Sequence, residues 1–424
     1  MSRGTDLSPR YNAPYLVGVY LAANAVRDAA VVIDGMSCAM SKAEFIAGNH
    51  DVFSTLLAPG GAHRIVCTMS DPLHLHHTAE EPVQRTLRAL LSSRRPAVVL
   101  LGALPMGHLA GIDYERIARR ETHAGKAPIV PVSAGFDGDW LDGYGEALDA
   151  IARHIRVAGA RPDPRRAAVI GYLWDRNERD HQANLYVIRG LLERLGLKLE
   201  SLWLSGGDFK DLERVRNAGT LISLPYGRKA GRTLAQRLRR PLVELGLPLG
   251  FAGTRAWVRR LRPGRTLADE ERRAKERVLP LLRALAERTV LFSGDPHLFE
   301  AFARFALELG MAPPAGVILG ARRRVCIRVP PYQPSLPLLL FEPTQETLRS
   351  EVDKLLDGRG VDLVVANSFF PRGRRLLSVP GMEFGFPSYR THQLTDAPFL
   401  GYEGAVWLAN RMFNAIGTDN RPGA

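Results

Sequence analysis

Cysteine is scarce in this sequence, and the pattern of the few cysteines excludes two kinds of site. The 424 residues contain three cysteines, Cys38, Cys67 and Cys326. Three thiols cannot form a disulfide framework, and no CxxC pair is present for a self-contained zinc or ferredoxin-type centre. A metal centre would therefore need ligands from a partner chain or from other residue types.

Long apolar runs are also absent. The longest, such as residues 97–101 and 336–341, are far shorter than the roughly 20 residues that cross a bilayer. The first residues, MSRGTDLSPRYNAP, lack the basic-then-apolar order of a secretion signal. We therefore expect a cytoplasmic protein with no membrane partner.

The charge balance is basic, with 57 Lys and Arg against 44 Asp and Glu and a formal net charge of +13. Such a balance permits nucleic-acid binding and equally suits an acidic protein partner. The basic residues lie in helical stretches without interleaved aromatic residues or a known reader motif. They include Arg237, Arg239, Arg240, Arg259, Arg260, Arg262, Arg272 and Arg273. We interpret them as a solvated face and expect no nucleic-acid partner.

Short apolar runs alternate with amphipathic stretches of roughly 12 to 18 residues, which indicates parallel sheets with crossover helices. The runs are nearly continuous rather than alternating, as in strands buried on both faces. The predicted strands are 30–33, 97–101, 129–132, 167–172, 220–224, 289–292, 316–319 and 363–366. The predicted fold class is α/β, with three doubly wound domains of mostly parallel sheets around a central cleft.

Two segments mark the expected domain boundaries. Residues 156–166, RVAGARPDPRR, place two prolines and a glycine between a helical pattern and a strand. Residues 267–288 form a charged, helix-prone stretch that leads into the next strand. The predicted domains are therefore 1–160, which holds the candidate site described next, 161–270 and 271–424.

The segment VVIDGMSCAMSK places Cys38 just after a buried strand, on a tight turn that Gly35 permits. Functional groups in α/β folds are presented at the carboxyl ends of parallel strands. The alternative interpretation is a packed structural cysteine, and the turn alone leaves both open.

The wider sequence resembles the nitrogenase component 1 family. Its opening, YNAPYLVGVYLAANAVRDAAVVIDGMSCA, is similar to the family's glycine-led helix, polar turn, strand and cluster cysteine. Further similar segments follow in order along nearly the whole chain: CTMSDP, LLGALPMGHLAGID, PIVPVSAGFDGDWLDGYGEAL, DLVVANS, EFGFPSYR and GYEGAVWLANRMFNAI. No single motif is specific, but their conjunction is.

The departures from the family pattern concern the cluster ligands. Catalytic subunits of the family generally offer three cluster cysteines, and only Cys38 falls on such a position here. The first is absent near Ala13 or Pro14, and Leu104 stands where the later one is expected. One thiolate cannot hold a [4Fe–4S] cluster. In having a single cysteine on this turn, the chain resembles the second, beta-type subunit of the cofactor-assembly scaffold and of protochlorophyllide and chlorophyllide reductases.

The resemblance thus implies that Cys38 is the fourth ligand of a [4Fe–4S] cluster shared across a subunit interface. It also implies a homologous partner subunit with the remaining cysteines, assembled as a heterotetramer, and a separate ATP-dependent iron protein as reductase. No match is visible to the cysteine and histidine that hold the molybdenum–iron cofactor, so the expected substrate is not dinitrogen.

Other candidate residues have plain structural alternatives. Cys67 is a packed strand-end residue or a substitute ligand, and Cys326 is a core residue. His74, His76 and His77 could bind a metal or deliver protons, or could form a solvated loop. His108 is likewise a candidate for proton delivery. The turn SGDPHLFEAF lacks the glycine patterns of nucleotide-binding loops, so any ATP would be bound by the reductase partner.

Three functions fit these features. The first is an oxidoreductase subunit that relays electrons through the shared cluster to a substrate. The second is a non-catalytic scaffold subunit for assembly of a metallocluster cofactor, which would use the same fold and ligand. The third is a glycosyltransferase or periplasmic-binding-like protein of similar α/β layout, without iron.

Overall fold

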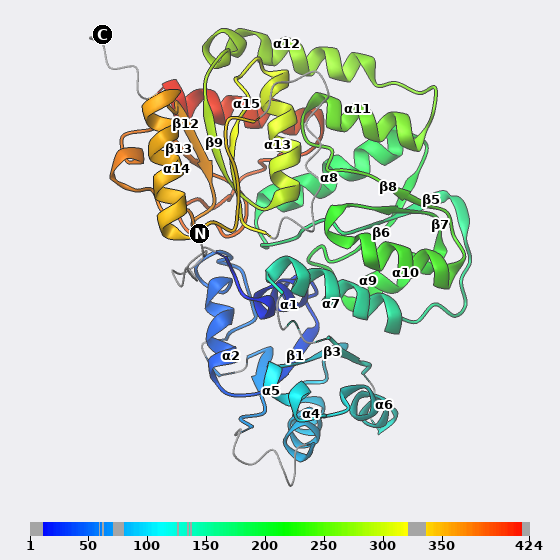
Figure 1. The fold of residues 1–424 in the computed structure, drawn as a ribbon. Helices are drawn as coiled ribbons and strands as arrows, with labels where there is room; N and C mark the ends of the chain where they lie inside the picture. Colours follow the sequence, from blue (N-terminus) through cyan, green and yellow to red (C-terminus); the bar gives the residue numbers. More distant parts are fainter. Residues whose placement is uncertain are drawn as a thin grey trace, which may run out of the picture. The chain divides into compact units, whose positions relative to one another are not determined.

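The computed structural model describes residues 12–58, 60–61, 63–70, 80–124, 127–133, 135, 138–320 and 336–417. Figure 1 shows the helices and strands of the chain, coloured along the sequence. The chain forms two compact units. One comprises Ala13–Glu178 and Leu192–Leu245. The other comprises Met1–Asn12, Arg179–Leu191 and Gly246–Ala424. We call them the first and the second unit and describe each by itself.

The first unit contains two four-stranded sheets, and every pairing between their strands is parallel. The first sheet has the order β2-β1-β3-β4, with β1 at Ala29–Asp34, β2 at Ile65–Cys67, β3 at Val98–Ala103 and β4 at Ile129–Pro131. The second has the order β6-β5-β7-β8, with β5 at Asp163–Ile170, β6 at Lys198–Leu202, β7 at Ala218–Ser223 and β8 at Leu242–Glu244.

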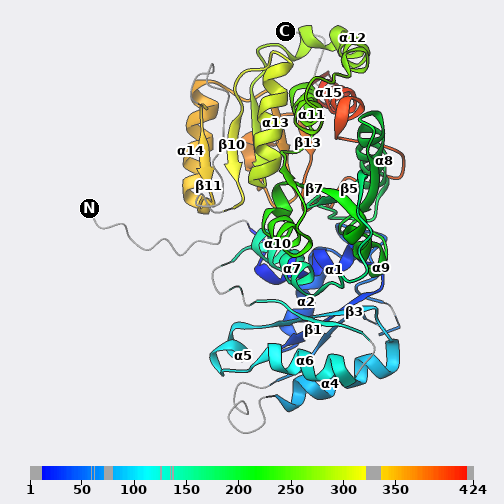
Figure 2. The same cartoon turned by 90° about the vertical axis from the view of Figure 1, so that its right-hand side faces the viewer.

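Helices cover both faces of the first sheet, as strands with continuous apolar runs require. On one face, Val32 and Leu101 pack with Leu87 and Ile117 of helices α4 and α6 (Figure 2). Helix α1 contacts β1, and α7 packs on α1 and on α10, which in turn contacts β7. The helices of this unit are α1 at Tyr15–Asn24, α2 at Cys38–Ser41, α4 at Glu81–Arg94, α5 at Pro105–Leu109, α6 at Tyr114–Ala124, α7 at Trp140–His154, α9 at Phe209–Glu213 and α10 at Arg228–Leu238, with short 3-10 turns η1 at Lys42–Phe45, η3 at Arg214–Asn217 and η4 at Pro225–Gly227.

The backbones of α1 and α7 touch each other. All residues of α1 are buried, and a Cβ at Gly18 would lie 1.8 Å from the carbonyl oxygen of Trp140. A Cβ at Gly143 would lie 1.9 Å from the carbonyl oxygen of Tyr15. Glycine is therefore required at both positions. Asp139 starts α7 with a capping box, in which its side chain accepts the N–H groups of Leu141 and Asp142.

The second unit holds one parallel five-stranded sheet of order β11-β10-β9-β12-β13. Its strands are β9 at Val290–Gly294, β10 at Ala315–Ile318, β11 at Leu339–Phe341, β12 at Leu363–Ala366 and β13 at Gly381–Glu383. The helical segments are α8 at Arg179–Arg194, whose last three residues belong to the first unit, α11 at Gly250–Leu261, α12 at Ala268–Leu285, α13 at Pro296–Glu308, α14 at Gln345–Gly358, η6 at Arg374–Leu376 and α15 at Gly401–Gly417.

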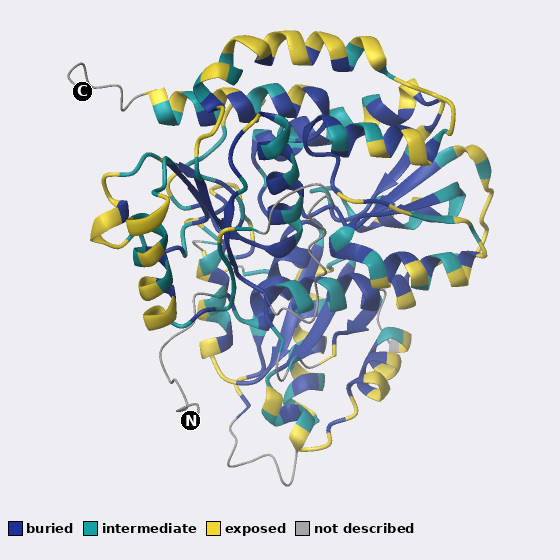
Figure 3. Cartoon of the chain, turned by 45° about the horizontal axis from the view of Figure 1, so that its top comes forward, coloured by how far each residue is buried: buried dark blue, intermediate teal, exposed yellow. Residues whose placement is uncertain are grey.

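Helices α13 and α14 cover opposite faces of this sheet (Figure 2). Phe292 of β9 packs on Phe299 and Phe302 of α13, with ring centroids 5.5 Å and 5.0 Å apart. On the other face, Leu291 shares a core with Leu348 and other residues of α14. Figure 3 shows the strands of the sheet mostly buried and α12 exposed along one side. The exposed basic residues of α12 are partly ion-paired, for example Arg277 with Glu403 of α15.

All eight predicted strands are confirmed, with ends shifted by a few residues. The fold class, α/β with parallel sheets covered by helices, is confirmed as well. The charged stretch before β9 is helix α12, also as predicted. Each sheet falls inside one of the three predicted domain ranges, whereas the compact units number two. The division into three domains around a cleft therefore stays a prediction. No helix among the described residues has the length and apolar character of a membrane span.

Candidate functional site

Cys38 lies on a turn at the carboxyl edge of the first sheet. The turn begins at Gly35, directly after β1, and Cys38 is the first residue of the short helix α2. Gly35 has a φ of +153°, and a Cβ there would lie 2.5 Å from the side chain of Leu104. A side chain at position 35 is thus excluded both by backbone conformation and by space. The residue Cys38 itself is exposed.

Hydrogen bonds fix the backbone of this turn. The N–H of Gly35 donates to the hydroxyl of Thr68 at 3.0 Å. The hydroxyl of Tyr20, on α1, donates to the carbonyl of Ala39 at 2.8 Å. The ammonium group of Lys42 donates to the carbonyl of Cys38 at 3.2 Å. The thiol of Cys38 is therefore presented by a backbone that is held from three sides.

A buried carboxylate organises the ends of three segments beside the turn. Asp34, the last residue of β1, is 2% exposed. One of its oxygens accepts the hydroxyls of Thr68 and Ser70, each at 2.7 Å. The other accepts the hydroxyl of Tyr114 at 2.6 Å. Three hydroxyl donors offset the loss of hydration that burial imposes on this carboxylate. Sequence reasoning did not identify this cluster, because its members lie up to 80 residues apart.

His108 belongs to the same edge. Its ring lies 4.9 Å from that of Tyr114, centroid to centroid. Burial lowers the pKa of His108, and the negative charge of Asp34 opposes that shift only in part. The imidazole is therefore held toward its neutral form, which can both donate and accept a proton.

Cys67 ends β2 and is buried, so its surroundings differ from those of Cys38. Burial raises the pKa of the Cys67 thiol to about 11, although the N–H of Met40 donates toward its sulfur and opposes the shift. The charges of Cys38 and Lys42 also act on Cys67. The structure thus places a second thiol near Cys38, but in its protonated, packed form at neutral pH.

The two positions where the family pattern expects further cysteines hold no ligand. Leu104 follows β3, and its N–H donates to the carbonyl of Asp34 at 2.9 Å, so its apolar side chain lies against the Gly35 turn. Ala13 is buried, and its carbonyl accepts the N–H of Trp140 at 3.1 Å. Pro14 precedes α1 as its N-cap residue. Carbon side chains at these positions cannot bind iron.

Several predicted candidates lie outside the described residues: Cys326, His74, His76 and His77. Within the described ranges, no group of three or more His, Cys, Asp or Glu residues is arranged to hold a metal ion. The turn before α13 is described, and its helix N-terminus is closed by its own sequence. The carboxylate of Asp295 accepts the N–H groups of His297 and Leu298, at 2.9 Å and 3.0 Å. The position that a phosphate would take is therefore occupied by a carboxylate.

A second buried polar cluster in the first unit was not predicted from the sequence. Asp51 is fully buried and accepts side-chain amides of Asn24 and Asn177, each at 2.7 Å. His50 lies beside it, with its Nε2 3.7 Å from a carboxylate oxygen of Asp175. The cluster joins the end of α1, the segment after η1 and the segment after β5. Its members are far apart in sequence. The only sign of the cluster in the sequence is that Asp51 and Asp175 are polar residues in largely apolar surroundings.

Comparison with known proteins defines the class. A family model described as nitrogenase component 1 type oxidoreductase matches residues 15–417. The chain therefore belongs to this family. A solved structure titled "Nitrogenase Cp1 at pH 6.5" superimposes with a TM-score of 0.80 at 16% identity, covering 100% of this chain and 96% of that one. At that identity the match shows the shared fold.

The curated relatives that the chain resembles are subunits of two kinds of enzyme. The nitrogenase molybdenum–iron protein beta chain of Methanothermobacter thermautotrophicus is 29% identical over 218 residues, which are 49% of this chain and 46% of that protein. Light-independent protochlorophyllide reductase subunit N of Chaetosphaeridium globosum is 25% identical over 240 residues, 51% and 52% of the two chains. The chain thus spans about half the length of the curated relatives it matches, and these include beta chains of nitrogenase molybdenum–iron proteins.

The residues of the Cys38 edge can be tested against the iron–sulfur cluster that the family implies. A [4Fe–4S] cluster takes four thiolates or substitutes. The described part of this edge offers one exposed thiol, one buried thiol and an apolar residue, Leu104. This set fits a chain that supplies a single ligand to a cluster held jointly with another chain. It does not fit a cluster held by the described residues alone.

Proposed function

We propose that this chain is the beta-type subunit of a nitrogenase-like component 1 oxidoreductase, and that Cys38 is its ligand to a [4Fe–4S] cluster shared with a homologous subunit. The exposed thiol of Cys38 on a fixed strand-end turn carries this proposal. The beta chains among the relatives support the assignment of a partner subunit. Bound there, the cluster would supply one-electron transfer.

The residues of this chain would position the ligand and exclude water around it. Gly35 and Thr68 fix the turn, Tyr20 anchors the start of α2, and Leu104 closes one side with carbon. Cys67 is the second candidate ligand, but its thiol would have to lose a proton that burial retains. His74, His76 and His77 remain predictions from the sequence. His108, held toward its neutral form, is the described residue best suited to pass a proton at this edge.

The wider assembly follows from the same proposal. A separate ATP-dependent iron protein would deliver electrons, and a homologous subunit would add the remaining cysteines in a heterotetramer. The substrate would lie in a cleft where three α/β domains, 1–160, 161–270 and 271–424, meet. It would not be dinitrogen, because the sequence shows no match to the residues that hold the molybdenum–iron cofactor.

Iron analysis of the chain, alone and with its partner, tests the shared cluster. The chain purified anaerobically alone should retain far less than a cluster's worth of iron, because it supplies one exposed thiolate. The complex with the homologous subunit should show a cluster signal in electron paramagnetic resonance after reduction with dithionite. About four irons per isolated chain, a full [4Fe–4S] complement, would contradict the proposal.

The same complex separates a reductase from an assembly scaffold. A reductase should turn over repeatedly when the iron protein, ATP and substrate are present. A scaffold should instead lose its bound metallocluster stoichiometrically to an acceptor protein. The proposal of an oxidoreductase fails if transfer to an acceptor occurs and no substrate is reduced.

A further inference from the structure

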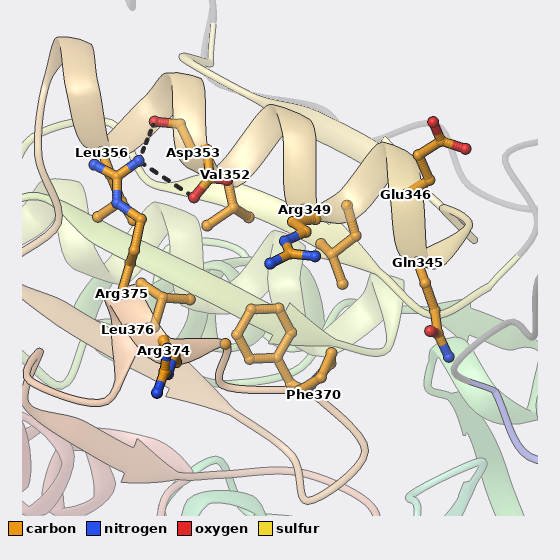
Figure 4. Close-up of a pocket in the computed structure, with 13 residues that line it drawn as sticks. Gln345, Glu346, Arg349, Val352, Asp353, Leu356, Phe370, Arg374, Arg375 and Leu376 are labelled. Carbon is orange, nitrogen blue, oxygen red and sulfur yellow. Dashed lines mark hydrogen bonds and ion pairs between the residues drawn. The ribbon is translucent and has the colours of Figure 1, made fainter.

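A pocket of about 560 Å³ opens in the second unit, between α14 and the segment around η6 (Figure 4). Its volume lies within the range of roughly 300 to 1,000 Å³ that small-molecule sites occupy. All residues that line it come from positions 345–376. The pocket is therefore built by one stretch of chain and does not depend on the Cys38 edge.

The floor of the pocket is apolar. Leu348 and Val352 of α14, Phe370 after β12, and Leu376 of η6 line it, and each is less than 10% exposed. These residues belong to the core that α14 forms with the sheet. The floor is therefore packed into the core of the unit, and an apolar body placed on it would be removed from water.

The charged residues at the mouth are not equivalent. Arg375 is engaged by carboxylates of α14, at 3.2 Å from Asp353 and 2.5 Å from Asp357. Arg349 points from α14 toward Phe370, whereas Glu346 points away (Figure 4). Within the part of the chain that the structure describes, Arg349 has no ion-pair partner. The pocket thus combines an apolar floor with a cation whose charge is available to a ligand.

We infer that this pocket binds a small organic anion, with its apolar body on the Phe370 floor and its carboxylate, sulfonate or phosphate against Arg349. An anion matches the available guanidinium, which forms charge-assisted hydrogen bonds with such groups. A single small molecule matches the volume and the closed floor. Neither the proposed cluster nor its partner subunit enters this inference.

Titration of the whole chain with two fluorescent probes tests it. Anilinonaphthalene sulfonate carries an apolar body and an anionic group, whereas phenylnaphthylamine is a neutral compound of similar shape. Arg349→Gln should weaken binding of the sulfonate about tenfold, the loss expected for one charge-assisted contact. It should leave binding of the neutral probe unchanged. Arg359→Gln, an exposed arginine beyond the end of α14, is the matched control and should leave both probes unaffected.

A pocket-filling variant tests the location. Gly373 lines the pocket, has a φ of −52°, and a Cβ there would meet nothing within 4 Å. Gly373→Trp should therefore fold, with an unchanged circular dichroism spectrum and melting temperature, and should abolish binding of both probes. The inference is overturned if the sulfonate does not bind the native chain, if Arg349→Gln binds it as tightly as Arg359→Gln does, or if the folded Gly373→Trp variant retains it.

Discussion

Cys38 and Cys67 lie at the same edge of one sheet, yet their thiols should differ in reactivity. With its pKa raised to about 11 by burial, Cys67 would be thiolate in about one molecule in a thousand at pH 8. Cys38 is exposed. Brief iodoacetamide labelling of the native chain, followed by peptide mapping, should modify Cys38 well before Cys67. Labelling of Cys67 should rise about tenfold per pH unit. Equal labelling of both at pH 8 would contradict the structure.

The hydroxyl of Thr68 should control the order of the Cys38 turn. Thr68→Val keeps the shape but leaves the Gly35 N–H without its acceptor and Asp34 without one donor. The expected cost is about 1 to 3 kcal/mol, because both groups are buried. Hydrogen exchange should become faster in the peptide that spans residues 35–41. Thr68→Ser, which restores the hydroxyl, should return exchange to near its native rate, and a Val variant with native exchange would refute the role.

What the sequence could predict at this scale was the position of Cys38, because a strand, a glycine and a cysteine follow one another within a few residues. The surroundings could not be predicted in the same way. Asp34, Thr68 and Tyr114 meet only through the tertiary packing of separate elements, and so do Asp51 and Asn177. Local patterns do not encode which distant polar groups share a buried hydrogen bond.

At the scale of elements, the contact of α1 with α7 should tolerate no side chain at position 143. A Cβ on Gly143 would lie 1.9 Å from a backbone oxygen, whereas one on Gly145 of the same helix would meet only the carbonyl oxygen of Tyr226, at 3.9 Å. Gly143→Ala should therefore cost about 3 kcal/mol or more, since backbone has to move. Gly145→Ala should be neutral or stabilising by up to about 1 kcal/mol. Thermal unfolding of the two variants measures the difference, and similar melting temperatures would contradict the packing.

The stability of the chain should depend on pH through Glu308, which binds the N-terminus of helix α11. Glu308 of α13 accepts the N–H groups of Phe251 and Ala252, at 2.8 Å and 2.9 Å, and burial raises its pKa. The folded chain thus holds the Glu308 proton more tightly than the unfolded chain does. The stability linked to this proton is present at low pH and is lost as the pH rises through the folded pKa.

Glu308→Gln, which does not titrate, isolates that contribution. The native chain should lose stability relative to the Gln variant as the pH rises from about 4, near the ordinary pKa of glutamate, through the raised pKa of Glu308 in the folded chain. Denaturant unfolding across this range measures it. A stability difference between the two chains that does not change with pH, or one that changes in the opposite direction, would show that the carboxylate is not destabilised by burial.

The strands that were predicted from the sequence differ in position and burial from those that were missed. Predicted strands such as β1, β3 and β9 are central and fully buried. The described strands that were missed, β2, β6, β8, β11 and β13, all lie at sheet edges. Most are three residues long and only partly buried. An edge strand needs no continuous apolar run, because it is stabilised by pairing with its neighbouring strand more than by its own composition.

At the scale of the whole molecule, motifs in order along the chain predicted the family, and the family model across residues 15–417 confirms it. The order of the motifs does not show which cluster ligands a partner subunit would supply. Three positions are informative only when taken together. Cys38 is exposed, Leu104 stands where the family pattern expects another cysteine, and buried Ala13 lies near the position of the remaining one. Together they favour a chain that completes a site rather than one that contains it.

The most direct test of this account compares two thiol deletions in the complex with the homologous subunit. Cys38→Ala removes the proposed ligand from a turn whose backbone is held by the side chains of Tyr20 and Thr68, so the complex should still assemble. Its iron content and its cluster signal in electron paramagnetic resonance should fall sharply. Cys326→Ala deletes the same chemical group elsewhere and should leave both intact. A Cys38→Ala complex with full cluster occupancy would contradict the account and make Cys38 a structural residue.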